Sequence, residues 1–423
     1  MYGLLYDVVI NIYKPFAAKF LERIGGGAFH ISLYNSLPGI VAALALLPGT
    51  LLLRKNKNVK SATVVLLRIT RSFLLLAALS PFFPENLRAV TFLFVISLMN
   101  FPDALSQSAI QSSLAKFFTS GEVRAQAISL RNKFGNFSIP VVTLIMGLII
   151  SFIPRSESQI VTFYQLFFVM SFLVGLAEVF VFKKFRYETE PDNALSETEP
   201  GNAPAEPEPG KQPVSDAEKN TDVTAPSKKG VIKSVLSNKV FRHYLFFTLI
   251  YYVTWQSGWA LSTIYQIENL GANEIWLALF AVGSGLTSFF SAAFWSRYIA
   301  KKGNGRAMVM AGYALALNMT FIALTPNLPL MVLACCYGGF AGIGINITLL
   351  HGLLIATPEK DRMVYIGMYN TFVNISLGVS PMLSLLLVNK IGIVYTMHVV
   401  GLSRVISASL LLLAYRKKLI GSE

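Results

Sequence analysis

Long apolar runs separated by short polar segments dominate this chain of 423 residues. Asp, Glu, Lys and Arg are absent from residues 28–53, 244–267, 275–296, 307–357 and 363–388. A helix that crosses a bilayer needs about 20 predominantly apolar residues, and these runs meet or exceed that length. They also lack the strict alternation that is typical of membrane-spanning strands. The pattern therefore predicts a polytopic membrane protein made of α-helices, whose backbone hydrogen bonds are satisfied internally.

Twelve membrane spans are predicted, in two groups of six. The first six are expected near residues 1–23, 28–53, 61–82, 88–115, 122–153 and 160–183. The second six are expected near residues 241–267, 274–297, 306–325, 328–357, 361–388 and 391–415. The run 307–357 is long enough for two spans around the segment TPNLP. The predicted fold class is all-α, with two six-helix bundles.

A segment of different composition separates the two groups. Residues 186–229 are rich in Pro, Glu, Ser and Thr and poor in large apolar side chains. Such a segment cannot bury enough apolar surface to fold, so we expect it to be disordered. The chain is thus divided into an N-terminal bundle (1–185), an acidic, Pro-rich linker (186–229) and a C-terminal bundle (230–423). The last begins with VIKSVLSNKVFRHY, which is expected to lie on the bilayer as a short amphipathic helix.

Charge supports the membrane assignment and orients the chain. Only 14% of the residues are charged, against about a quarter in soluble proteins. The formal net charge is +14, and its Lys and Arg lie in short loops after even-numbered spans, such as RKNKNVK and RYIAKKGNGR. By the positive-inside rule, both termini and the linker are expected in the cytoplasm, with the protein in the plasma membrane. The basic balance is explained by orientation, so nucleic acid is not an expected partner.

An internal repeat relates the two groups of spans. The stretch RAQAISLRNKFGNFSIP, at the head of span five, aligns without gaps with RMVYIGMYNTFVNISLG at the head of span eleven. The alignment pairs Asn132 with Asn370 and Asn136 with Asn374. Carried back one span, the same register pairs Ser108 with Asn346. Repeats of this kind, with a site between them near the middle of the bilayer, are typical of secondary transporters.

At this point the chain resembles the major facilitator superfamily over nearly its whole length. The resemblance rests on six plus six spans, a long linker and basic loops after spans two and eight. The loop motif of that family is Gly-x-Leu-x-Asp-Arg-x-Gly-Arg-Arg/Lys. In GTLLLRKNKN the matching residues are Gly49, Leu51, Arg54 and Lys57. Leu53 stands where the family has its acid.

The second copy of the motif departs from the family in the same way. AAFWSRYIAKK keeps Arg297, but Ser296 stands at the place of the acid. In the family that acid helps to lock the cytoplasmic gate, so this chain is expected to lock it otherwise. Arg54 and Arg297 remain gating candidates. The paired asparagines 132, 136, 370 and 374 are the candidates that would substitute for the missing acids.

The resemblance implies that spans 1, 4, 7 and 10 line a central cavity, where charges are costly and functional by default. Asp103 in span four follows Pro102, and a carboxyl in a poorly hydrated cavity can exchange a proton near neutral pH. It is the first candidate for proton coupling. The alternative is a structural ion pair with Arg68 or Arg71 of span three.

Span one carries two further candidates. Asp7 and Lys14 lie two turns apart and project to one face. Asp7 is the second candidate for proton coupling, and Lys14 is a candidate to attract an anionic substrate. The alternative is that both side chains snorkel toward the membrane surface. Glu178 and Arg404, on the outer spans six and twelve, are expected to make structural pairs.

Spans seven and ten supply candidates for substrate contact. Tyr252, Trp255, Gln256 and Trp259 share one helical face, on which an aromatic compound or a sugar could stack. The alternative is that this face packs against another helix or lies in an interfacial belt. Asn346 and His351 add polar atoms on span ten, although a lone histidine is more often a hydrogen-bonded core residue.

These observations favour a transporter over an enzyme. The chain has no phosphate-binding GxxxxGK[ST] motif and no GxSxG or HExxH. Its two cysteines are adjacent and its histidines number four, so neither a metal nor another cofactor is expected. We predict a monomeric secondary transporter of a small-molecule substrate, driven by protons, with export of an amphipathic or aromatic compound preferred. An uncoupled facilitator, uptake of a sugar or organic anion, and a receptor or scaffold acting through the acidic linker are the alternatives.

Overall fold

The structure is a computed structural model that describes residues 2–55, 59–117, 138–184, 235–358 and 362–420. Within these ranges the chain is helical apart from short connections, and they contain no strand. The linker, residues 231–234 of the stretch before span seven, and the head of span five, including Asn132 and Asn136, lie outside the described residues. The rest of the stretch before span seven is described, and from Lys239 on it is the start of the helix Lys239–Ile264.

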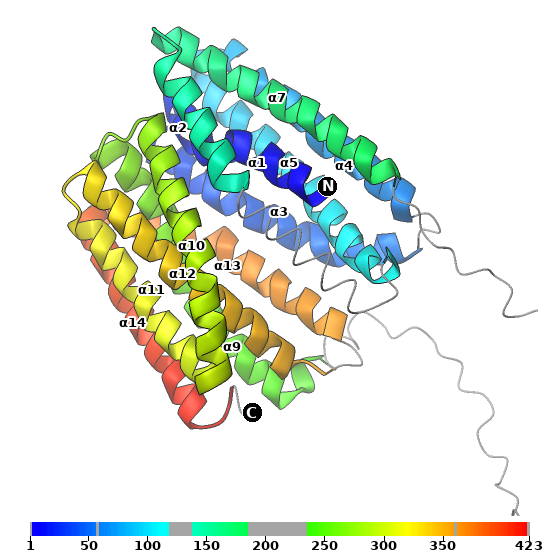
Figure 1. Cartoon of the computed structure of the whole chain (residues 1–423), viewed down its shortest axis with the longest axis vertical. Coiled ribbons are helices and arrows are strands. Elements are labelled where there is room, and N and C mark those ends of the chain that lie inside the picture. The colour runs from blue at the N-terminus through cyan, green and yellow to red at the C-terminus, as the bar shows by residue number, and fades with distance from the viewer. Residues whose placement is uncertain (1, 56–58, 118–137, 185–234, 359–361, 421–423) are drawn as a thin grey trace, which may run out of the picture.

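The first six spans form one bundle, the N-terminal half (Figure 1). Its helices are α1 (Tyr2–Tyr13), α2 (Ala17–Arg23), α3 (Ala28–Lys55), α4 (Val59–Ala78), α5 (Glu85–Phe117) and α7 (Glu157–Lys184). Two short 3-10 turns, η1 (Lys14–Phe16) and η2 (Ser80–Phe82), follow α1 and α4. The described part of span five is the helix Ser138–Phe152.

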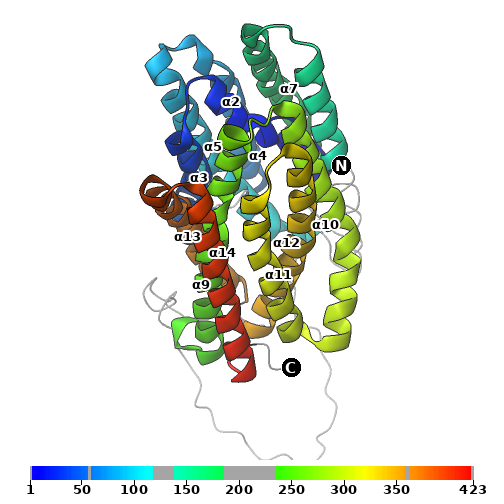
Figure 2. The same ribbon diagram turned by 90° about the vertical axis from the view of Figure 1, so that its left-hand side faces the viewer.

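The last six spans form the C-terminal half. Its helices are α9 (Lys239–Ile264), α10 (Glu274–Lys302), α11 (Asn304–Leu324), α12 (Leu328–Ala356), α13 (Arg362–Ile391) and α14 (Ile393–Arg416). A π-helical turn, η3 (Tyr265–Asn269), follows α9. Figure 2 shows α11 and α14 side by side, as their packing contacts require.

The helices agree with the predicted spans. Among the described residues, nine helices are long and apolar enough to cross a membrane. The remaining predicted spans are α1–η1–α2, the helix Ser138–Phe152 and α9, all of them helical. Short polar residues set several helix starts, because the side chains of Asn238, Asn273 and Asn327 accept hydrogen bonds from the first turns of α9, α10 and α12.

Span one is not a continuous α-helix. Pro15 lies in η1 and lacks a backbone N–H, so the α-helical hydrogen-bond pattern is interrupted there. The break separates α1, with Asp7, from α2, with Arg23, and places Lys14 at the junction. Span one therefore presents two short helices with different surroundings.

The two halves meet in a buried apolar cluster at the end of the molecule that contains Arg23, called here the Arg23 end. The cluster includes Phe20 and Phe92 of the N-terminal half and Leu277 and Met319 of the C-terminal half. The helix Ser138–Phe152 also contacts α10 there, because a Cβ at Gly147 would collide with Ala278. A second cluster lies within the C-terminal half alone.

A close crossing of α3 and α13 joins the halves along their length. A Cβ at Gly39 would lie 2.6 Å from the backbone oxygen of Asn374 and 2.8 Å from Cβ of Leu377. A Cβ at Gly378 would lie 2.5 Å from Cγ1 of Ile40. Small residues allow such close approach of helices in membranes. This crossing and the Arg23 end are therefore the main contacts between the halves.

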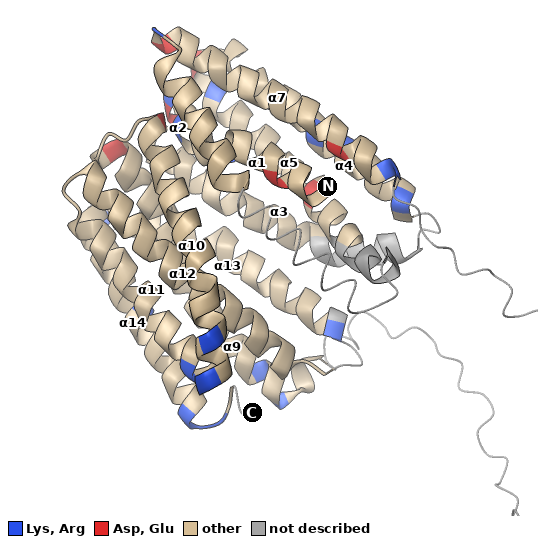
Figure 3. Ribbon diagram, in the orientation of Figure 1, with Lys and Arg blue, Asp and Glu red and all other residues tan. Residues whose placement is uncertain are grey.

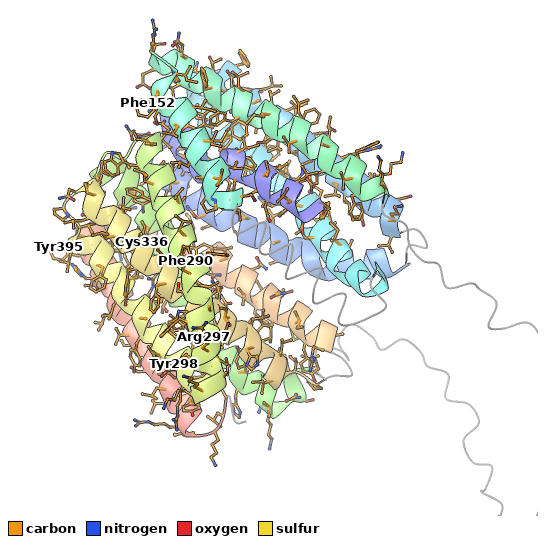
Figure 4. The ribbon with its side chains drawn as sticks, in the orientation of Figure 1. Phe152, Phe290, Arg297, Tyr298, Cys336 and Tyr395 are labelled. Atoms are coloured by element: carbon orange, nitrogen blue, oxygen red, sulfur yellow. The ribbon has the colours of Figure 1, made fainter. Side chains whose placement is uncertain are left out.

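The outer surface is apolar and the basic residues lie near its ends. Phe152, Phe290 and Tyr395, labelled in Figure 4, have 75%, 73% and 69% of their surface exposed. Such side chains suit contact with lipid. Lys and Arg gather at the C-terminal ends of α7, α10 and α14, whereas acidic residues lie near α2 (Figure 3). The molecule therefore has a basic end opposite the Arg23 end.

Candidate functional site

A buried ion pair joins α4 to α7 inside the N-terminal half. Arg71 and Glu178 have 1% and 0% of their side-chain surface exposed. Arg71 Nε donates to Glu178 Oε2 at 2.8 Å, and Nη2 lies 2.8 Å from the same oxygen. Gly175, one turn before Glu178, makes room for the arginine, because a Cβ there would lie 2.7 Å from Arg71 Cδ. In this conformation the partner of Arg71 is thus Glu178, and the predicted alternative, an ion pair of Arg71 with Asp103, is not formed.

Asp103 lies on α5 beside this pair without a salt bridge to it. The Tyr6 hydroxyl on α1 donates to Asp103 Oδ2 over 3.5 Å, and Asp103 Oδ1 is buried with no hydrogen-bond partner among the described residues. The charges of Arg71 and Lys14 act on the carboxyl. Arg68, the other predicted partner, is exposed on α4. Asp103 is therefore a half-buried carboxyl with one oxygen available.

The structure separates the two candidates on span one. Asp7 is half-buried in α1, and its backbone oxygen accepts a hydrogen bond from the Asn11 side chain at 2.7 Å. Lys14 is exposed in η1. Lys14 is close enough to Asp103 for its charge to act there. Arg131 and Lys133, which could pair with Asp7, lie outside the described residues.

The predicted aromatic face of α9 is real and continues onto α13. Tyr252 stacks on Trp255 with ring centroids 5.6 Å apart, and Trp255 meets Trp259 edge to face at 6.1 Å. Tyr369 of α13 meets Tyr252 at 6.2 Å. Trp255 is buried, Tyr252 is half-buried and Trp259 is 40% exposed. Tyr252 and Trp259 are the members with surface to offer to a ligand.

Gln256 does not line an open cavity in this conformation. It is 2% exposed, and its Nε2 donates to the Val373 carbonyl of α13 at 3.4 Å. The Ser376 hydroxyl donates to Gln256 Oε1 at 2.5 Å. In this conformation the polar atoms of Gln256 hold α9 to α13, and its contact with substrate stays a prediction.

The two candidates on α12 are exposed. Asn346 Nδ2 donates to the Gly342 carbonyl one turn earlier at 2.9 Å, which leaves its side-chain oxygen free for another donor. His351 is exposed, so it is not the buried core histidine of the alternative interpretation. A Cβ at Gly342 would meet nothing within 4 Å, so the face of Gly342 and Asn346 is open.

The gating candidates make no cross-helix bond in the described part of the chain. Asn374 Nδ2 donates to the Asn370 carbonyl of its own helix at 2.8 Å, and Asn370 is exposed. Arg297 is exposed on α10. Arg54 lies at the end of α3, where its side chain is outside the description. Asn374 does contribute to the contact between the halves, because its backbone oxygen lies at the close crossing with Gly39.

An ion-pair network that the sequence analysis missed joins the halves at the Arg23 end. Arg23 of α2 donates from Nε to Glu274 Oε1 at 2.6 Å and from Nη2 to Glu274 Oε2 at 3.1 Å. Tyr164 of α7 donates to Glu274 Oε1 at 3.0 Å, and Arg23 also pairs with Glu157. Glu274, at the start of α10, is 2% exposed. The only signal in the sequence was that these charges stand at span ends, which carries no information on partners.

Arg404 is a buried arginine of a different kind. It is 3% exposed on α14, and its guanidinium donates to the carbonyls of Trp255 at 2.7 Å, Thr254 at 3.2 Å and Leu315 at 3.5 Å. No acidic partner occurs among the residues the structure covers. The predicted structural role is met by backbone oxygens of α9 and α11, and the expected pairing with an acid is not.

The same architecture occurs in known proteins. The family model of the Major Facilitator Superfamily matches residues 2–357. No curated protein matches. The fold is similar to the nucleoside transporter NupG (D323A mutant), with 11% identity, TM-score 0.68, and 97% of this chain and 98% of that chain covered. A POT family transporter in complex with a thioalcohol-conjugated peptide has 11% identity, TM-score 0.69 and coverages of 98% and 95%.

A D-xylose-proton symporter is similar to the same degree, with 11% identity, TM-score 0.66 and coverages of 97% and 94%. At such low identity these structures establish the fold and say nothing of the solute. Together with a family match over most of the chain, they exclude a coincidental likeness of helical bundles. The chain belongs to the major facilitator superfamily.

Proposed function

We propose that this protein is a secondary transporter that moves a small solute across the plasma membrane by alternating access, coupled to protons. The observation that carries the proposal is the ion-pair network of Arg23 and Glu274, which joins the two bundles at one end together with the apolar cluster there. A contact that joins the halves at one end is what alternating access needs, because each end must open in turn. We place the Arg23 end outside the cell and the basic end, with both termini and the linker, in the cytoplasm.

Proton coupling is proposed from the surroundings of Asp103. A half-buried carboxyl with one oxygen unpartnered, next to a tyrosine hydroxyl, is suited to bind and release a proton. One of the similar structures is that of a D-xylose-proton symporter, so this fold accommodates proton coupling. An uncoupled facilitator remains the second candidate, and it requires Asp103 to stay ionised throughout the cycle.

The proposed substrate carries a flat or ring-shaped apolar part. Successive ring contacts join the aromatic side chains Tyr369, Tyr252, Trp255 and Trp259. In this row the ring of Trp259 is exposed and that of Tyr252 is partly exposed. Aromatic faces stack on nucleobases, aromatic acids and the apolar faces of sugars. Asn346 and His351 would supply hydrogen bonds, and Lys14 a positive charge. Export of an amphipathic compound is preferred on this basis, with uptake of a sugar or organic anion as the alternative.

Transport is tested with the purified full-length chain in proteoliposomes that contain a trapped pH indicator. A panel of nucleosides, aromatic acids, sugars and amphipathic cations is added with and without an imposed pH gradient. We expect at least one solute to accumulate only with the gradient. Asp103→Asn should abolish accumulation and preserve exchange of that solute, because exchange needs no net proton movement. Glu85→Gln, which changes an exposed acid on the same helix, is the control.

Two outcomes would contradict parts of the proposal. If Asp103→Asn vesicles still accumulate solute under a pH gradient, Asp103 is not the coupling group. If deletion of residues 190–225 leaves a folded protein that has lost its cellular function but keeps transport in vesicles, the scaffold alternative is favoured, with the linker as its binding segment.

A further inference from the structure

The buried polar groups of the N-terminal half contain one more acid than the pair with Arg71 can neutralise. Glu178 and Asp103 both lie within range of Arg71, and the charge of Asp103 also acts on Glu178. Arg71 carries one positive charge, and the other cation that acts on Asp103, Lys14, is exposed to solvent. Two ionised carboxylates around one buried guanidinium would leave an uncompensated buried charge, which is costly.

The geometry of the ion pair leaves room for a proton. A fork-to-fork pair would use both oxygens of the carboxylate. Here Nε and Nη2 of Arg71 both approach Glu178 Oε2, and no residue that the structure describes forms a hydrogen bond with Glu178 Oε1. Asp103 Oδ1 is in the same condition. Buried polar atoms are normally bonded, so two orphaned carboxyl oxygens around one arginine call for a bound species that satisfies them.

Two tyrosines of α1 flank these oxygens. The Tyr6 hydroxyl contacts Asp103, and its ring lies under the Arg71 guanidinium with Cζ 5.3 Å from the ring centroid. Tyr2, one turn earlier, has a buried hydroxyl that lies close to Glu178 and Gln107. This hydroxyl forms no hydrogen bond with any described residue. The charges of Arg71 and Asp103 also act on the Tyr13 hydroxyl. Among the described residues, the groups that act on one or the other carboxyl are Arg71, Lys14, Tyr2 and Tyr6, and Tyr13 lies within range of Asp103.

We propose that Glu178 and Asp103 form one proton-binding site, in which a single proton is shared between the two carboxyls and Arg71 neutralises whichever is ionised. This deepens the proton coupling proposed above and rests on it for its role in transport. When the proton is on Asp103, Glu178 keeps its pair with Arg71, as in this structure. When the proton is on Glu178, the guanidinium is released to Asp103. Like charges held close together cannot both ionise readily, which is why pairs of this kind hold one proton.

A proton shared between Asp103 and Glu178 can be distinguished from a proton that Asp103 alone carries. If Glu178 only paired with Arg71, Asp103 alone would carry the proton. In the shared site the protonated carboxyl is partly a glutamic acid. The two cases differ in which residue type gives the infrared carbonyl band of a protonated carboxyl.

The experiment is infrared difference spectroscopy of the purified full-length protein at neutral pH, with no solute. The band to be assigned is the protonated-carboxyl signal that wild type has and Asp103→Asn lacks. Wild type is then prepared with ¹³C in the carboxyls of either all glutamates or all aspartates. We expect each label to shift part of the band. If the aspartate label alone shifts it, or if wild type and Asp103→Asn do not differ, the shared site is refuted.

Substitution adds a second line that does not depend on labelling. Glu178→Gln should remove the band as well, because Arg71 then pairs with Asp103 and keeps it ionised. A band that persists in a folded Glu178→Gln protein contradicts the proposal. Glu85→Gln, an exposed acid, should leave the band unchanged. Because the spectra need no solute, a shared proton in a protein that shows no gradient-driven transport would refute the coupling and preserve the site.

Discussion

Two buried arginines show how differently a single charge can be accommodated inside a bundle. Arg71 has a carboxylate partner, and Arg404 is held by three backbone carbonyls. Gly258 lies one turn after Thr254, and a Cβ there would collide with the Arg404 guanidinium. Arg404 therefore ties α14 to the middle of α9, directly behind the aromatic face. Arg71 instead belongs to a set of groups whose charges can change.

Removing Arg71 alone should destabilise the protein more than removing Arg71 and Glu178 together. Arg71→Leu leaves Glu178 buried without its counterion, and breaking such a pair costs about 3–5 kcal/mol. Arg71→Leu combined with Glu178→Leu should recover most of that loss, because an apolar pair needs no desolvation of charge. The free energy of unfolding of the purified protein, measured by chemical denaturation in detergent, checks this.

Asp103 provides the matched comparison for this cycle. Arg71→Leu combined with Asp103→Leu should recover less stability than the combination with Glu178→Leu, because Glu178 then remains buried and unpaired. Equal recovery by the two double variants would mean that Asp103 is as much a partner of Arg71 as Glu178 is, contrary to the 2.8 Å geometry.

At the scale of helices, apolar runs predicted the spans well because bilayer thickness sets their length. Helix α12, predicted over 328–357, is observed at Leu328–Ala356. Packing faces were predicted less well. On α12 a Cβ at Gly342 would meet nothing within 4 Å, whereas a Cβ at Gly338, one turn earlier, would lie 3.0 Å from the Asn318 side chain. The closest approach is at Gly339, where a Cβ would collide with the Ser284 backbone of α10. A helix without a polar side gives no signal for its rotation.

The polar residues inside spans were found from the sequence, but their partners were not. Asp103 and Glu178 stand out because charges are rare in spans. Whether Arg71 meets one or the other depends on the rotation of α4, α5 and α7, which an apolar run does not encode. Gln256 was assigned to a cavity because it shares a face with Trp259, yet it faces α13. Successive residues on a helix are rotated by 100°, so an error in the predicted rotation of the helix moves a side chain from the cavity to a contact with another helix.

The crossing of α3 and α13 should be sensitive to one methyl group. Gly39→Ala places Cβ 2.6 Å from the backbone oxygen of Asn374 and 2.7 Å from the backbone nitrogen of Gly378, and neither is the end of a flexible side chain. The helices must separate, so this conformation should become less stable relative to one with the halves rotated apart. Gly342→Ala, which meets nothing within 4 Å, is the control. Distances between spin labels across the Arg23 end should broaden toward larger values in Gly39→Ala alone.

At the scale of the whole molecule, the repeat and the linker predicted two bundles, but not the contact that closes them. Arg23 and Glu274 stand far apart in the chain, each at the end of a span, where charged residues are ordinary. In the proposed alternating-access cycle their pairing exists only while the Arg23 end is closed. A sequence encodes all the states of such a cycle together, so a contact of one state gives no separate pattern.

The Arg23 end should also respond to pH through Glu268, which lies in η3 beyond the end of α9. Burial, and then the negative charge of Glu22 in the other half, raise the pKa of Glu268 above its usual 4.5. Both causes depend on closure of this end. The closed form is therefore favoured while Glu268 is protonated, and loses that advantage as the pH rises through the raised pKa. Label distances across the end should lengthen as the pH rises through this raised pKa, and Glu268→Gln should remove the dependence.

The pair of Arg23 with Glu274 is expected to set the balance between closed and open ends. Glu274 is buried and receives hydrogen bonds from Arg23 and Tyr164, and charge-assisted bonds of this kind are worth about 1.5–3 kcal/mol each. In an open form Glu274 would be hydrated and would lose little by substitution. Glu274→Gln should therefore shift the equilibrium toward the open form by at least about tenfold, which corresponds to about 1.4 kcal/mol.

Glu157 of the same network gives the matched control, because its side chain is 78% exposed and an exposed ion pair contributes only about 0–1 kcal/mol. The measurement uses spin labels at the exposed positions of Ser158→Cys and Leu330→Cys, one in each half, with Cys335 and Cys336 replaced by serine. Pulsed dipolar spectroscopy then gives the populations of short and long distances. Glu274→Gln should enrich the long distances and Glu157→Gln should leave them nearly unchanged. Equal effects of the two variants would show that closure depends on net charge at this end and not on the buried pair.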